Sequence, residues 1–330
     1  MATFFATLTP MLTLFLCIAV GFVLKRTNIF PDNAGSTMAK METWIFGPCI
    51  SFVTMMRFCN FSNLYTHATN IVMMAISVGV ALAISYALVG FFTKKDDSDR
   101  GIYSYSLTFT NYSYMGDPLV LALFGEETFA YYKLAVLPLT IVVFVWGINI
   151  LIPQKQEKKR SILGYLYTAP TVALFIGIFF GLTGFGKYLP AFVISALDSL
   201  KACMGPVAML LAGFTVAKYD ILGMLKSKKV YAFTLLRLIV IPVIIIAALF
   251  GIKKLVDILF AFKISNDILF LCFFATAGPV GLNAIVYPES YGGNSQAGAA
   301  LTLVTHTLCI ITIPVLYAIM VALFGTPFGA

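Results

Sequence analysis

The chain has 330 residues, of which 60% are hydrophobic and 11% charged, and its mean hydropathy is +0.94. A soluble domain is about one-quarter charged because its surface faces water, so this composition excludes a soluble protein. The net charge of +8 is typical of basic cytoplasmic loops. It does not indicate nucleic-acid binding, because no basic face or groove-reading motif accompanies it.

Apolar segments fill the chain from end to end, and each is close to the length of about 20 residues that a membrane-crossing helix needs. The ten expected helices span residues 4–24, 35–58, 70–92, 101–124, 129–152, 163–183, 192–217, 230–250, 267–288 and 296–324. The first has no basic stretch before it and is too long for a signal-peptide core, so we expect a retained helix. The sequence predicts an all-α, multi-pass membrane protein with a single integral membrane domain.

In the second helix, Ser51 follows the step Gly47–Pro48. We expect its hydroxyl to approach a bound substrate, although a serine can equally bond to the backbone of its own helix.

The fourth helix contains the polar stretch TNYSYMGDPLVLALFG, residues 110–125. Asn111 can donate and accept hydrogen bonds to a carboxylate or amide substrate, or instead join two helices. Asp117 directly precedes Pro118, and a carboxylate at membrane depth is costly and usually functional. It could carry a proton, bind a cation or pair with a basic side chain.

The ninth helix carries Pro279 and Asn283, and the tenth carries His306. Asn283 has the same two interpretations as Asn111. Histidine titrates near neutral pH and could relay protons, or it could be a satisfied packing residue. Other charged residues are expected mostly to reach the membrane interfaces, with Arg57 and Arg237 the better candidates for attracting an anion. These other charged residues, in or near the predicted helices, are Glu42, Arg57, Lys133, Lys201 and Arg237.

No motif indicates catalysis, a nucleotide or a metal. The six cysteines lie singly in apolar stretches, which is typical of packing residues. The near-phosphate-loop GLTGFGKY, residues 181–188, leaves a membrane helix and lacks the final Ser or Thr. We therefore expect no enzyme activity, no cofactor and no metal, and only a coupling proton or sodium ion.

The distribution of Lys and Arg predicts the orientation. Thirteen lie in loops after odd-numbered helices and four after even-numbered ones, the latter being Lys187, Lys253, Lys254 and Lys263. The first set includes Lys155, Lys158, Lys159 and Arg160. We expect this set to face the cytoplasm, with both termini outside the cell membrane.

Prolines recur at an offset of about 160 residues, which indicates an internal repeat. The pairs are Pro10 with Pro170, Pro31 with Pro190, Pro48 with Pro206, Pro118 with Pro279, and Pro153 with Pro314. The expected repeats are 1–158 and 159–330. Because each would hold five helices, an odd number, the second would enter the membrane from the opposite side, as in secondary transporters.

The pair Pro118 and Pro279 predicts a matched break in helices four and nine. Broken backbone at membrane depth survives only inside protein or beside a wet cavity. We therefore expect both breaks to meet at one midplane site, where helix N-termini suit an anion and free carbonyls suit a cation.

Three stretches resemble the auxin efflux carrier family, which includes bacterial permeases and plant auxin exporters. They are GPCISF at 47–52, TNYSYMGDPLVLALFG at 110–125 and GPVGLNAIVYPESYGG at 278–293. The resemblance implies ten helices in two inverted repeats, a scaffold of helices 1, 2, 6 and 7, and a transport domain of helices 3–5 and 8–10. It also implies broken helices that cross at their prolines, and homodimers. Asp117 departs from the pattern, since many relatives carry an apolar residue there.

The function expected from these features is secondary transport of a small organic anion, a carboxylate or an auxin-like acid, by alternating access at the crossover. The predicted substrate-binding residues are Ser51, Asn111, Asp117, Pro118, Pro279 and Asn283, and the predicted coupling residues are Asp117 and His306. Two alternatives stay open: a sodium-coupled symporter of the bile-acid type, and a membrane receptor or sensor that transports nothing.

Overall fold

The computed structural model describes residues 2–61, 64–152, 164, 167–219, 223, 226–259, 263–290 and 295–329. Across these residues the chain forms α-helices with short 3-10 and π turns, and its one β feature is an isolated bridge. The all-α prediction is confirmed. The basic loop residues Lys155, Lys158, Lys159 and Arg160 and the turn at 291–293 lie outside the described residues.

The first half of the chain forms twelve described elements. They are α1 (Ala2–Arg26), α2 (Ala34–Met41), η1 (Glu42–Phe46), α3 (Gly47–Phe58), α4 (Leu64–Leu88), η3 (Val89–Phe91), α5 (Arg100–Thr108), η4 (Tyr112–Gly116), α6 (Asp117–Ala135), α7 (Leu137–Val142), η5 (Val143–Gly147) and α8 (Ile148–Leu151). Several of these follow one another without a gap, so that α2, η1 and α3 form one helical run.

The second half forms a similar series. Its described elements are α10 (Ala169–Thr183), η6 (Phe185–Tyr188), α11 (Ala191–Val216), α13 (Lys228–Leu235), η7 (Leu236–Val240), α14 (Ile241–Leu259), α15 (Asp267–Thr276), α16 (Asn283–Ser290), α17 (Gln296–Phe324) and η8 (Pro327–Gly329).

Five described helices are long and apolar enough to cross a membrane by themselves. They are Phe4–Arg26, Thr66–Phe91, Ala191–Val216, Lys228–Leu259 and Gln296–Phe324. A sixth candidate is the pair Tyr112–Ala135 and Leu137–Leu151, bent by 45°. The protein is therefore a multi-pass membrane protein, while the full set of ten crossings remains a prediction.

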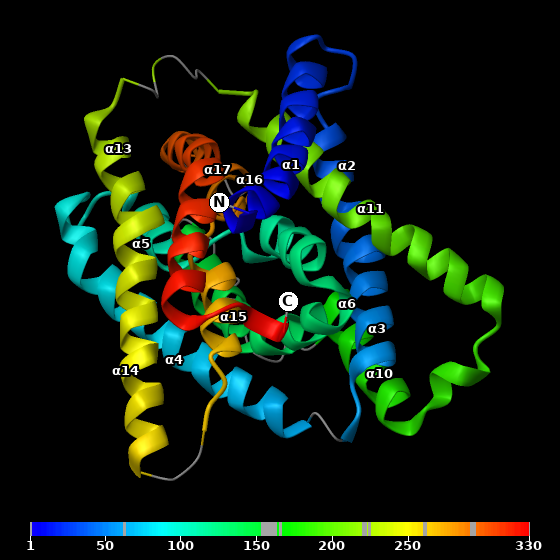
Figure 1. Ribbon diagram of the computed structural model, residues 1–330. Helices are drawn as coiled ribbons and strands as arrows, with labels where there is room; N and C mark the ends of the chain where they lie inside the picture. The colour runs from blue at the N-terminus through cyan, green and yellow to red at the C-terminus, as the bar shows by residue number, and fades with distance from the viewer. Residues whose placement is uncertain are drawn as a thin grey trace.

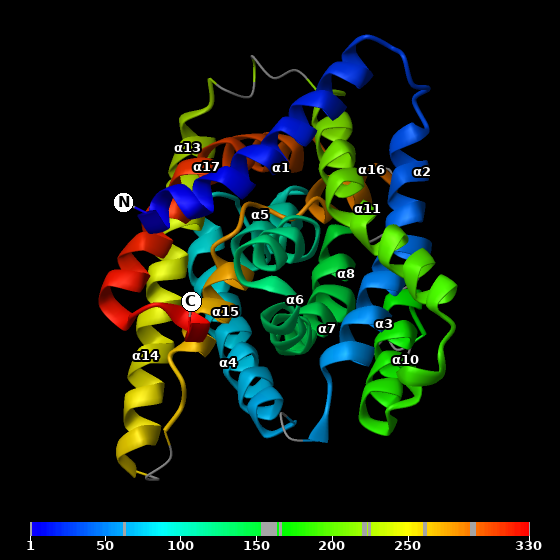
Figure 2. The same ribbon diagram turned by 45° about the vertical axis from the view of Figure 1, so that its right-hand side comes forward.

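The helices can be divided into two groups, which α1 bridges because it packs against α11 and also crosses over to α17 (Figures 1 and 2). The first helix group consists of α1, α2, α3, α10 and α11, and the second consists of α4 to α8 and α13 to α17. Within the first group, α1 packs against α11 and α3 against α10. A side chain at Gly213 would collide with the Ile18 carbonyl, and one at Gly177 with the backbone of Phe52. These glycines therefore allow the helix backbones to approach closely.

Three of the four described π turns end two residues before a proline. η1 precedes Pro48, η4 precedes Pro118 and η7 precedes Pro242, whereas η5 has no proline at that position. A proline has no N–H for the carbonyl four residues earlier, and its ring clashes with that carbonyl. The turn widens by one residue instead, so that the Gly47 N–H donates to the carbonyl of Glu42. Such turns are rare and are frequent at functional sites.

The interruption of the predicted fourth helix does not lie at its proline. α5 ends at Thr108, residues 109–111 are non-helical, and Pro118 lies in the first turn of α6. Pro118 follows η4 in one continuous helical run, and the widened turn accommodates its missing N–H without ending the helix. A second interruption within α6 is at Gly125, whose φ of 78° favours glycine. This matches the expected end of the fourth helix at residue 124.

Candidate functional site

Two interrupted helices meet in the interior of the bundle. The first interruption, residues 109–111, separates α5 from η4, and the second, residues 277–282, separates α15 from α16. Pro279 lies in the second interruption. Pro118 lies beyond the first one and packs against α11, because a Cβ added at Gly205 would lie 3.0 Å from the Cβ of Pro118. The two prolines therefore do not occupy equivalent places, contrary to the expectation that the helices cross at their prolines.

The two interruptions hydrogen-bond to each other. Thr110 and Val280 pair as an isolated antiparallel bridge, and the Asn111 N–H donates to the Pro279 carbonyl at 2.7 Å. A Cβ at Gly281 would lie 3.0 Å from the Thr110 carbonyl oxygen, so this close approach requires glycine. Backbone groups freed by the breaks thus satisfy each other, as an environment without bulk water demands.

Neighbouring residues of α17 hold both interruptions in place. The Val280 N–H donates to the Thr305 hydroxyl at 3.1 Å, and the Asn111 amide nitrogen lies 3.1 Å from His306 Nε2. His306 Nδ1 lies 2.8 Å from the Thr302 carbonyl. A carbonyl only accepts, so Nδ1 carries the proton and Nε2 accepts from Asn111. His306 is thus a neutral residue that positions Asn111, with both ring nitrogens engaged.

A polar cavity of about 170 Å³ lies between the two helix groups at this crossing. The first group contributes Glu42, Thr43, Gly47, Ser51, Pro170 and Met204, and the second contributes Tyr105, Thr110, Asn111, Tyr112, Ser113, Tyr114, Lys133, Gly281, Leu282 and Asn283. Both η4 and α16 begin at the cavity, and the N-terminus of a helix carries partial positive charge and unbonded N–H groups.

Lys133 is the one basic side chain among the described residues that line this cavity. Its ammonium group lies 2.8 Å from Oδ2 of Asp117, which is fully buried. The Ser113 hydroxyl lies 3.4 Å from the same oxygen. Asp117 therefore pairs with a basic side chain, one of the three roles that the sequence leaves open. An ammonium group has three donors, so Lys133 can bind a further acceptor inside the cavity.

Three of the predicted substrate-binding residues line the cavity directly. Ser51 is buried on α3, Asn111 is the last residue of the first interruption, and Asn283 is the first residue of α16. Asn283 also hydrogen-bonds to the Tyr105 hydroxyl. The structure therefore brings Ser51, Asn111 and Asn283 together. Asp117 does not line the cavity but pairs with Lys133, which does. In the same way, His306 contacts the cavity residue Asn111.

Three basic residues of the membrane segments lie elsewhere. Arg57 of α3 and Lys201 of α11 both bind Glu126 of α6, at 3.2 Å and 2.6 Å, and Arg57 also binds Asp198 at 2.6 Å. This outer ion-pair cluster joins the two helix groups. Arg237 is fully buried and has no hydrogen-bond partner among the described residues, but it lines neither described cavity. The structure thus gives neither arginine a place beside the candidate site.

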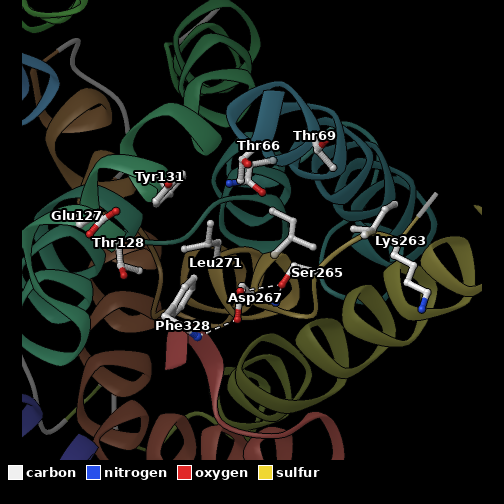
Figure 3. A pocket seen from close by; sticks show the side chains of 13 residues that line it. Thr66, Thr69, Glu127, Thr128, Tyr131, Lys263, Ser265, Asp267, Leu271 and Phe328 are labelled. Atoms are coloured by element: carbon white, nitrogen blue, oxygen red, sulfur yellow. Dashed lines mark hydrogen bonds between the residues drawn. The ribbon is translucent and has the colours of Figure 1, made fainter. Parts of the chain in front are cut away.

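A second cavity, of about 470 Å³, lies within the second helix group (Figure 3). Threonines and Tyr131 line it from α4 and α6, and Asp267 lines it from the start of α15. Asp267 already accepts bonds from the Ser265 hydroxyl at 2.7 Å and the Phe328 N–H at 2.8 Å. Its carboxylate thus ties the C-terminal turn to the start of α15. For this reason we take the smaller cavity as the candidate site.

Sequence reasoning missed Glu42 and Lys133, which it expected to reach the membrane interface. Glu42 is 2% exposed, and neither carboxylate oxygen has a hydrogen-bond partner in the described part of the chain. The sequence feature that could have indicated Glu42 is its distance from the following proline. Glu42 lies six residues before Pro48, at the start of the widened turn that the proline imposes.

Apolar helices around a cavity lined by polar side chains, with two interrupted helices meeting there, are typical of secondary transporters. A family model described as membrane transport protein matches residues 6–163 and, a second time, residues 158–317. These matches cover most of the chain, which therefore belongs to this family, the auxin efflux carrier family. The double match confirms the two-fold repeat predicted from the prolines. A comparison with curated proteins gives no match.

Proposed function

We propose that the protein is a secondary active transporter of a small organic anion in the cell membrane, and that the anion binds in the cavity at the crossing. The observation that carries this proposal is Lys133, a largely buried cation that lines the cavity with donors still available. An anion there would also meet the amides of Asn111 and Asn283 and the N-termini of η4 and α16. Family membership favours transport over catalysis.

The size of the cavity supports a compact substrate. Its volume of about 170 Å³ is below the range of about 300–1,000 Å³ that is typical of sites for drug-sized ligands. A short carboxylate such as malate or malonate fits this volume better than an indole acid, and a bile acid least well. Neither the bile-acid symporter nor the receptor alternative gains support from any described feature.

We further propose that the first helix group is the scaffold and the second the transport domain. The cavity lies between them, so a relative movement of the two groups would open it to one side and then to the other. The outer ion-pair cluster joins the groups at Arg57, Glu126 and Lys201. By the distribution of Lys and Arg, this end faces away from the cytoplasm.

Uptake of labelled carboxylates into proteoliposomes tests the proposal. We expect malate or malonate to accumulate under an imposed proton or sodium gradient, and Asn283→Ala to reduce this uptake at least tenfold while the protein stays folded. Glu127→Gln is a matched control, because Glu127 lies at the second cavity and is exposed. No uptake of any short carboxylate by the wild-type protein would contradict the proposed function.

A further inference from the structure

Glu42 is a buried carboxylate that the site, as described so far, does not use. It lines the cavity from η1, is 2% exposed, and has no hydrogen-bond partner for either carboxylate oxygen in the described part of the chain. An isolated ionised carboxylate out of water is very costly unless a cation or several donors compensate it. The position therefore calls for a bound cation or proton.

Among the described residues, no basic side chain of the elements that pack against η1 pairs with Glu42. η1 packs against α2, α3, α10 and α11. The basic residues there are Lys40, which is exposed, and Arg57 and Lys201, which bind Glu126; α10 has none. Asp198, the acid on α11, binds Arg57.

Across the cavity, the Tyr114 hydroxyl is hydrogen-bonded to Thr43, and the negative charge of Asp117 opposes a second negative charge at Glu42. Lys133 is held by Asp117 at 2.8 Å. Among the described residues, no group of three or more His, Cys, Asp or Glu side chains could hold a metal ion, which favours a proton over a metal cation at Glu42.

We propose that Glu42 is the proton-binding residue that couples anion transport to a proton gradient. One proton binds a carboxylate oxygen of Glu42 as the anion binds Lys133, and both leave together on the other side. An anion on Lys133 places a further negative charge in the cavity, which favours protonation of Glu42. Because binding linkage is reciprocal, protonation of Glu42 must strengthen anion binding by the same factor. This inference rests on the proposed function and names its coupling site.

Glu42→Gln tests the proposal, because an amide resembles the protonated carboxyl in size and charge. In the wild-type protein, the affinity for malonate should fall by up to about tenfold per pH unit as pH rises, the limit for one linked proton. In Glu42→Gln the affinity should not change with pH. This variant should retain exchange of labelled for unlabelled malonate but lose accumulation driven by a pH gradient. Glu42→Asp should keep the pH dependence, and Glu127→Gln should behave as wild type.

Two results would overturn the inference. One is a Glu42→Gln variant that still accumulates malonate in response to a pH gradient. The other is loss of exchange as well as accumulation, which would make Glu42 part of the anion site or of the fold. The proposed function fails separately: in that case the wild-type protein neither exchanges nor accumulates malonate.

Discussion

At the scale of single residues, the site depends on polar side chains whose partners come from distant parts of the chain. Asn111 is held by His306 at 3.1 Å, and His306 by the Thr302 carbonyl at 2.8 Å. A lone histidine in an apolar helix suggests a proton relay or a packing residue when only the sequence is known. In the structure both ring nitrogens have partners, and we infer that His306 fixes the orientation of an amide at the cavity.

Replacement of this histidine should therefore act through Asn111. In His306→Ala, the Asn111 amide loses a buried partner, and we expect a loss of about 1–3 kcal/mol in the free energy of unfolding and a clear reduction in carboxylate uptake. Thermal unfolding in detergent and proteoliposome uptake measure the two effects. Thr307→Ala is the control, because Thr307 is exposed on the same helix and bonds only to Leu303 of its own helix. Wild-type uptake by His306→Ala would contradict this role.

At the scale of the elements, prolines widen helices one turn ahead of themselves. η1 and η4 both end two residues before a proline and both contribute side chains to the cavity. The widened turn at residues 42–46 brings Glu42 to face the cavity. In a regular α-helix, Glu42 and the residues before it would be turned about the helix axis by about one residue, away from this orientation. Each proline thus shapes the site without lining it.

Pro48→Ala should restore a regular helix between residues 42 and 48. We expect the thermal stability of the protein to stay equal or to rise, because an alanine supplies the missing N–H. Uptake should fall because Glu42 turns away from the cavity. Pro314→Ala is the control, since Pro314 lies inside α17 without a π turn. Unchanged uptake by Pro48→Ala would show that the widened turn does not place Glu42.

The sequence predicts the helices well and the interruptions less well. Runs of apolar residues are sufficient to identify membrane helices, because polar side chains are costly in contact with lipid. Residues 109–111 contain no proline that would mark the first interruption. The interruption forms instead through pairing of Thr110 with Val280, which is far away in the chain. Glu42 and Lys133 were missed for a related reason. Whether a charged side chain near a helix end reaches water or a buried cavity depends on which helices pack beside it.

At the scale of the whole molecule, the two helix groups meet at the cavity, along α1 and α17, and further out at the outer ion-pair cluster. Glu126 of α6 lies between Arg57 of α3 and Lys201 of α11. Most of these side chains are partly exposed, so each pair contributes little to stability, about 0–1 kcal/mol. Their effect should instead appear in the balance between conformations, since they join the groups that move in the proposed cycle.

Glu126→Gln should loosen the outer contact between the groups. In a cysteine-free background, Ser51→Cys at the cavity should react slowly with a membrane-impermeant thiol reagent added from outside. We expect the further change Glu126→Gln to speed this reaction at least threefold, with little change in thermal stability. Equal rates in the presence and absence of Glu126→Gln would contradict a role of the cluster in closing this side.

The most direct test of the account is binding of labelled malonate to the purified protein. We predict one bound malonate per wild-type chain and none for the double variant Lys133→Gln/Asp117→Asn, which removes both buried charges together and so leaves neither unpaired. Thermal unfolding of the double variant should remain close to wild type. Undiminished malonate binding by this folded double variant would contradict the account, because the anion would then bind somewhere other than the cavity at the crossing.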